Sequence, residues 1–145
     1  MRGAPAPCAC PTGFVFVLAH MAAPLTTLAL LEALAEPTRL RIVNCLAAAP
    51  LFVSDLKILL DLPQPTVSRH LRILRDIGLV RDTSISQFVL YRLRRPAEPL
   101  GRVLSAVLDA AASEPGLRGE RALALEQSRR HARLRTEANL EERPV

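Results

Sequence analysis

The chain has few aromatic residues: there is no Trp, one Tyr and four Phe among its 145 residues. Half of all residues are nevertheless apolar, which predicts a folded chain rather than a disordered one. Its core must therefore consist mainly of Leu, Val, Ile and Ala, as in small helical domains. The length allows one domain with a real core but not two.

The sequence also lacks the motifs of known catalytic sites. It has no Gly-rich phosphate loop, no G-x-S-x-G and no H-E-x-x-H. Its three His and three Cys form no recognisable catalytic arrangement. We therefore expect a protein that is not an enzyme.

Cysteine is too scarce for a disulfide framework. Cys8 and Cys10 form a Cys-x-Cys that could hold a soft metal ion, if the first 20 residues belong to the native protein. The simpler interpretation is that this pair lies in a leader. Cys45 falls within a predicted helix, where a free cysteine usually acts as a small buried hydrophobe. These three cysteines are the candidate metal ligands.

Long apolar runs are missing as well. The apolar stretch 14–23 is too short to span a membrane, so we expect a cytoplasmic protein with no membrane partner. A signal peptide is the weaker alternative, because only Arg2 precedes this stretch. We interpret residues 1–23 as a leader, either disordered or upstream of a true start at Met21.

Positive charge is concentrated in one segment. Residues 64–95 carry seven Arg and two Asp, a surplus equal to the net charge of +5 of the whole chain. Residues 96–145 carry eight Arg and eight acidic residues and are balanced. A basic patch confined to one segment is typical of a phosphate-binding surface, whereas a merely solvated face mixes both signs.

The spacing of apolar residues predicts a mainly helical chain with one small β-hairpin. Leucines at helical spacing indicate a first helix, which Glu36-Pro37 ends because proline is tolerated only at the first helical positions. The predicted helices cover about 25–35, 37–48, 55–60, 64–77, 98–113 and 119–139.

The segments 79–83 and 87–93 are rich in strand formers and predict the two strands of the hairpin. The polar residues 84–86 separate them. Because the tip contains no Gly, we expect a loop longer than a tight two-residue turn.

A helix, a tight turn, a second helix and a hairpin form the layout of a winged helix-turn-helix, whose second helix enters the major groove of DNA. In helix 64–77, Val67, Leu71 and Leu74 form a core stripe, which leaves polar side chains for the groove. Arg69 can donate two bonds to a guanine, and Gln64 can bind an adenine. The helix N-terminus, together with Thr66 and Ser68, suits a phosphate. The predicted DNA-binding residues are Gln64, Thr66, Ser68, Arg69, His70, Arg72, Arg75, Arg81 and Arg92.

Five short motifs follow one another at fixed spacing: 34–42 (LAEPTRLRI), 55–56 (DL), 64–74 (QPTVSRHLRIL), 78–80 (GLV) and 91–93 (YRL). This ordered set resembles the ArsR/SmtB family of repressors over about residues 25–112. The resemblance implies a homodimer formed mainly by the first and fifth helices. It also implies binding to a palindromic operator in double-stranded DNA, and release when an inducer binds, usually a metal or metalloid ion.

The sequence departs from that family at both familiar metal sites. Arsenite-responsive members carry Cys-x-Cys just before the Asp-Leu pair, where this chain has Phe52 and Ser54, which cannot replace soft thiolates. Zinc-sensing members place Asp and His along the fifth helix, and residues 98–113 contain no His. Redox-sensing relatives pair a cysteine in the second helix with one in the fifth, but Cys45 has no such partner. The inducer is left open among a metal, a redox signal and an organic signal.

The wing departs too, because its tip lacks the Gly and Arg of many relatives, so we expect helix 64–77 to supply most of the affinity for DNA. His131 has Glu137 and several Arg nearby in sequence, which predicts a surface position.

We expect three regions: a leader (1–23), a DNA-binding and dimerisation domain (24–113), and a C-terminal helix and tail (114–145). The alternative function is a winged-helix module for protein contacts. Whether the protein represses or activates is also left open.

Overall fold

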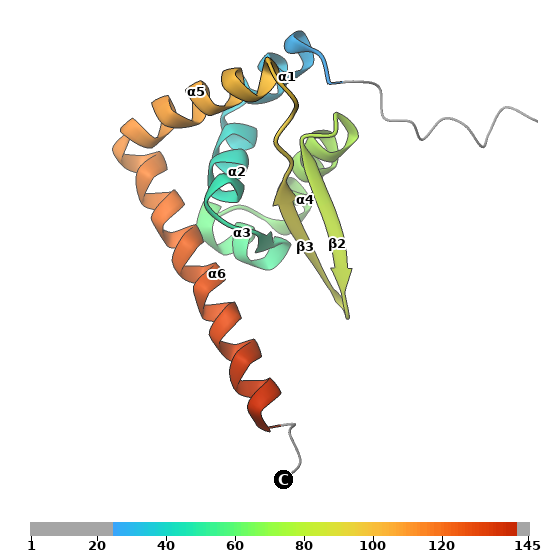
Figure 1. Cartoon of the computed structure of the whole chain (residues 1–145), viewed down its shortest axis with the longest axis vertical. Coiled ribbons are helices and arrows are strands. Elements are labelled where there is room, and N and C mark those ends of the chain that lie inside the picture. Colours follow the sequence, from blue (N-terminus) through green and yellow to red (C-terminus); the bar gives the residue numbers. More distant parts are fainter. Residues whose placement is uncertain (1–24, 142–145) are drawn as a thin grey trace, which may run out of the picture.

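A computed structural model describes residues 25–141 of the chain, with side chains for residues 25–134. The predicted leader, with Cys8 and Cys10, lies outside the described residues. Helices dominate, and a small antiparallel sheet completes the fold, as predicted (Figure 1). In chain order the elements are α1 (Thr27–Leu34), α2 (Pro37–Ala48), β1 (Leu51–Phe52), α3 (Val53–Leu60), α4 (Gln64–Asp76), β2 (Val80–Ile85), β3 (Phe88–Leu93), α5 (Leu100–Ser113) and α6 (Pro115–Glu141).

Local capping explains where the first helices begin. The Thr26 hydroxyl accepts a hydrogen bond from the backbone N–H of Ala29 (3.2 Å) and caps α1. The Glu36 carboxylate accepts one from the N–H of Arg39 (2.7 Å), and Pro37 occupies the first position of α2. These signals lie in the sequence, which is why both helices match the prediction closely.

Helix α3 begins at Val53, two residues before the predicted start. The Asp55 carboxylate accepts a hydrogen bond from the backbone N–H of Phe52 (3.0 Å) and thereby closes an earlier first turn. Asp61, in the left-handed conformation (φ 52°), ends the helix. Three residues separate α3 from α4, whose predicted core stripe of Val67, Leu71 and Leu74 is fully buried.

The sheet has three strands in the order β1-β3-β2, one more than predicted. Strand β1 is only two residues long and pairs with β3. Strands β2 and β3 pair as far as Ile85 and Phe88, so the hairpin turn consists of Ser86 and Gln87 alone. The predicted longer loop is therefore wrong. Ser86 adopts a positive φ of 52°, a conformation that non-glycine residues accept at moderate cost when pairing on both sides fixes the turn.

Helix α6 begins at Pro115, four residues earlier than predicted, and follows α5 almost directly. It runs past α2 and α3, and it extends from the body in the same direction as the β2–β3 hairpin (Figure 1). Two contacts fix it to α2: the Asn44 amide donates to the carbonyl of Leu117 (2.7 Å), and Arg41 pairs with Glu120 (2.6 Å). Within the described residues, none of the helices is long and apolar enough to cross a membrane.

Candidate nucleic-acid interface

The outward side of α4 carries positive charge that no acidic residue of the described part of the chain pairs with. Arg69 and Arg72 are exposed, opposite the buried stripe of the same helix. Neither makes an ion pair with another residue of the described part of the chain. Gln64 and Ser68 are exposed on the same helix. Four of the predicted DNA-binding side chains are therefore available to an external ligand.

A hollow of about 460 Å³ lies where α4 meets the sheet. Cationic and hydroxyl-bearing side chains surround it, a combination that suits a phosphate group. Its polar lining consists of Ser68, Arg69, Arg72, Arg75 and Tyr91.

Arg75 is already partly engaged within the protein. Its Nη1 atom lies 3.4 Å from the Asp82 carboxylate of β2, so this pair ties the end of α4 to the first strand of the hairpin. Tyr91 lies opposite Asp82 in the strand register. Burial, together with the negative charge of Asp82, raises the pKa of the Tyr91 phenol, so its hydroxyl stays protonated and can donate a hydrogen bond.

The two predicted wing cations form a separate patch. Arg81 and Arg92 are direct partners across β2 and β3, and both are exposed. Because side chains alternate along a strand, they lie on the face of the hairpin opposite to Asp82 and Tyr91. Like charges directly opposite each other destabilise a sheet, and an anion bound between them would remove that penalty.

The start of α4 offers fewer free N–H groups than predicted. Pro65 has none, and the N–H groups of Thr66 and Val67 both donate to the carbonyl of Pro63 (3.0 and 3.2 Å). Thr66 itself is half-buried. A phosphate at this N-terminus would therefore find few backbone N–H groups, and it would depend on Gln64 and on the side chains that follow it in α4.

His70 was predicted on the DNA-facing side, but the structure turns it inward. Its side chain is only 17% exposed, and its Nδ1 atom lies 3.4 Å from the Glu36 carboxylate at the start of α2, without hydrogen-bond geometry. Burial would raise the pKa of Glu36, but hydrogen bonds from Arg39 and Thr38 and the nearby His70 outweigh it and lower that pKa. His70 thus lies mostly between α4 and the start of α2, and its contact with DNA stays a prediction.

His131, which was predicted at the surface, is 32% exposed and also has a buried partner that the sequence did not reveal. Its Nε2 atom lies 2.9 Å from the Asp55 carboxylate, which is almost fully buried. The Gln127 amide donates to the same oxygen (3.2 Å), so two residues of α6 hold the start of α3. The only sequence signal was an acidic residue in the first turn of a helix, and it did not reveal its distant partner.

Cys45, a candidate ligand, is fully buried in the core. Burial and, to a lesser degree, the negative charge of Glu120 raise its pKa to about 12. The side chain therefore remains a neutral thiol, a poor metal ligand and a poor nucleophile. Among the residues that the structure describes, no three His, Cys, Asp or Glu side chains gather as they would around a metal ion.

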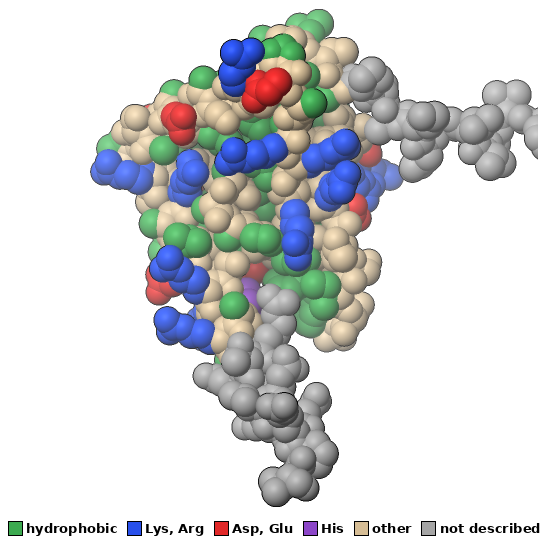
Figure 2. Space-filling view, viewed as in Figure 1, with side chains coloured by type: hydrophobic (Ala, Val, Ile, Leu, Met, Phe, Trp, Pro, Cys, Tyr) green, Lys and Arg blue, Asp and Glu red, His purple; other side chains and the backbone are tan. Residues whose placement is uncertain are grey.

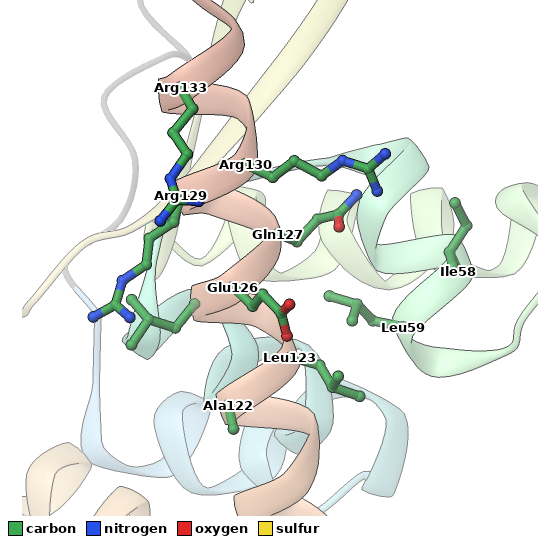
Figure 3. Close-up of a pocket in the computed structure, with 10 residues that line it drawn as sticks. Ile58, Leu59, Ala122, Leu123, Glu126, Gln127, Arg129, Arg130 and Arg133 are labelled. Atoms are coloured by element: carbon green, nitrogen blue, oxygen red, sulfur yellow. The ribbon is translucent and has the colours of Figure 1, made fainter.

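A groove of about 1030 Å³ lies between α3 and α6 (Figure 3). Leu59 and Leu123 lie on its two sides, and Arg129 and Arg133 lie on the side of α6 away from α3 (Figure 3). None of the predicted DNA-binding residues lines it. Over the molecular face in Figure 2, Lys and Arg side chains outnumber acidic ones but form no single continuous patch.

Comparison with known proteins identifies one family of bacterial regulators. The model described as "Bacterial regulatory protein, arsR family" matches residues 36–82. The chain is 38% identical over 94 residues to the arsenic resistance transcriptional regulator ArsR1 of Pseudomonas putida, covering 63% of this chain and 73% of that protein. It is 44% identical over 70 residues to the arsenical resistance operon repressor of Escherichia coli, covering 48% and 60%. It spans about half (47%) of the repressor SmtB of Mycobacterium tuberculosis, at 45% identity over 64 residues (44% of this chain).

Solved structures agree with the fold. HlyU from Vibrio cholerae superposes with a TM-score of 0.51 at 31% identity, covering 57% of this chain and 88% of that one. The transcriptional repressor BigR from Xylella fastidiosa gives 0.51 at 27% identity, covering 59% and 82%. The superpositions cover somewhat more than half of the chain.

Proposed function

This chain belongs to the bacterial ArsR family of regulatory proteins, and from that premise we propose that it is a sequence-specific DNA-binding repressor of transcription. One observation carries the proposal. Arg69 and Arg72 project, without ion pairs among the described residues, from a helix whose opposite face is locked into the core. A rigid helix with free cations on one side is what major-groove recognition requires.

The exposed side chains divide into two roles. In this proposal Arg69 and Gln64 read base edges, which their exposure on the outward side of α4 supports. Arg72 and Arg92 contact phosphates, which sets affinity and register rather than sequence. Arg75 contributes less to phosphate binding than its charge suggests, since Asp82 holds it.

The proposed repressor is a homodimer on a (pseudo)palindromic operator, with half-sites about one helical turn apart. The exposed leucines of α1 support a dimer: Leu28 is 66% and Leu31 47% exposed, and both would be covered by a second copy. Arg39 fixes α1 for this role by donating to the carbonyls of Ala33 and Glu32 (both 2.8 Å). We place α5 at the same interface. The protein has no catalytic role in this proposal and acts in the cytoplasm.

A metal or metalloid inducer does not fit the residues present at the family's familiar positions. Phe52 and Ser54 supply no soft ligand at α3, and α5 contains no His. A metal response would therefore depend on Cys8 and Cys10, and an organic signal is the alternative. The names of two relatives mention arsenic resistance, but those names describe the relatives and not this chain.

Selection of duplexes from a random DNA library tests the proposal. We expect enrichment of one palindromic sequence, bound by two chains per duplex in a mobility-shift titration. We also expect stronger retention on heparin than on a neutral resin. The competing function, a winged-helix module for protein contacts, predicts no enriched sequence and equal retention on the two resins.

A further inference from the structure

An apolar hollow of about 460 Å³ lies between the hairpin tip, the start of α3 and α6. Its walls come from Phe52 in β1, Ile85 and Phe88 at the tip, and Leu134 in α6. Phe88 and Leu134 are each about half exposed (52% and 54%), so apolar surface is left open to water here. Figure 2 shows hydrophobic side chains gathered where the hairpin tip approaches α6. We call this site the tip hollow.

Aromatic rings define the tip hollow. The Phe52 ring meets the Phe88 ring edge-on at 5.9 Å between centroids, and it meets the His131 ring in the same way at 5.2 Å. In the described part of the chain, Phe and Tyr together occur only three times, and two of these residues line this one hollow. Rings that present edges and faces to one space suit a planar aromatic guest.

Three polar residues, Ser54, Ser86 and His131, give the hollow chemical specificity. The His131 Nε2 atom lies 2.9 Å from Asp55, whose carboxylate can only accept, so Nε2 carries the proton. In the neutral ring, Nδ1 is then an acceptor that takes no part in this bond. An acceptor in an aromatic hollow favours a guest that carries a hydroxyl group.

The walls also connect the hollow to the DNA-binding parts. The Asp55 carboxylate that orients His131 accepts from the N–H of Phe52 (3.0 Å) at the start of α3. Helix α3 packs on α4, and the tip residues belong to the wing. A guest that separates Phe52 from Phe88 would therefore move the wing relative to α4.

We propose that the tip hollow binds a small planar aromatic molecule carrying a hydroxyl group, and that this molecule is the inducer. The second part rests on the proposed function, whereas binding itself does not. The hollow lies beside Phe52 and Ser54, where arsenite-responsive relatives of this family would place thiolates.

Fluorescence titration of the full chain with 2-naphthol, without DNA, tests the binding. The absence of Trp keeps protein emission from masking the probe. We expect one saturable site per chain, with naphthalene, which lacks the hydroxyl, about fivefold weaker. Phe88→Ala and Leu134→Arg should each weaken binding at least tenfold. The matched control is Leu123→Arg, because Leu123 lies on the same helix outside the hollow and is almost as exposed (53%) as Leu134 (54%).

Absence of saturable binding, or equal affinity for 2-naphthol in all four proteins, would overturn the site. A second measurement, the affinity for the selected duplex with and without saturating 2-naphthol, separates the two parts. We expect at least a tenfold loss of DNA affinity in the wild type and none in Phe88→Ala. Probe binding that leaves DNA affinity unchanged would overturn the inducer role. Probe binding by a chain that selects no DNA sequence would overturn the proposed function and leave the site standing.

Discussion

Arg81 and Arg92 face each other directly across β2 and β3, and neither makes an ion pair with a described residue. Two like charges in this arrangement cost stability, so a bound phosphate is the natural partner for the pair. Under the proposed function, this exposed pair is an anion-binding surface that costs the fold some stability. The Arg81–Arg92 pair thus connects the register of β2 and β3 with the proposed binding of DNA by the domain.

Replacing Arg92 with alanine should therefore weaken DNA binding while sparing the fold. We expect affinity to fall on all sequences alike, and the salt slope of the binding constant to flatten by about 1. The free energy of unfolding should rise by about 0.2–1 kcal/mol, because the like-charge pair is gone. Mobility-shift titrations at several salt concentrations and urea denaturation measure the two effects. Arg118→Ala, an exposed arginine of α6, serves as the control and should change neither.

Arg75 and Asp82 should behave oppositely when each is removed. Asp82→Asn releases Arg75 for phosphate, so we expect tighter binding and a salt slope steeper by about 1. Arg75→Ala should weaken binding on all sequences. Both residues are more than a third exposed, so either change should alter the unfolding free energy by no more than about 1 kcal/mol. If both variants lost affinity, the pair would act by holding the wing in place instead.

Asp55 should matter for stability more than any other acidic residue described. Asp55→Ala leaves the N–H of Phe52, the Gln127 amide and the His131 ring without their acceptor. We expect the unfolding free energy to fall by about 2–4 kcal/mol, measured by urea denaturation with circular dichroism. Asp109→Ala removes an exposed carboxylate from α5 and should have almost no effect. A loss below about 1 kcal/mol for Asp55→Ala would mean that water replaces the carboxylate.

The Cys45 thiol should be unreactive in the native protein. Since burial raises its pKa to about 12, almost no thiolate exists at pH 8. Iodoacetamide should label Cys45 fully in urea but not in buffer, as read by peptide mass. Because the folded pKa lies above the unfolded value of 9.0, the stability from burying the thiol is complete below about pH 9 and is lost as the pH rises towards 12. Rapid native labelling at pH 8 would restore Cys45 as a candidate redox sensor.

Local patterns in the sequence predicted most of the helices. Apolar spacing and proline positions fixed α1, α2 and α4 to within a few residues, because these signals act within one helix. The exposed arginines of α4 followed from the same periodicity. The sequence therefore predicted the part of the candidate site that depends on one helix face.

Features that depend on distant partners were missed. Strand β1 has only two residues and exists because β3 pairs with it. The tight turn at Ser86 forms because pairing extends to the tip, against the local preference for glycine. The partners of His70 and His131 were also missed, because Glu36 and Asp55 lie far from them along the chain. Periodicity within a helix says on which side a residue lies, but not which charged group meets it there.

The most direct test of DNA reading by α4 is the affinity of Arg69→Ala for the selected duplex and for single-base variants of it. The matched control is Arg129→Ala, an exposed arginine on α6. We predict that Arg69→Ala loses about 1–3 kcal/mol of binding free energy and discriminates less at one base pair of each half-site. The control should bind like the wild type. Unchanged affinity and unchanged discrimination in Arg69→Ala would contradict the account.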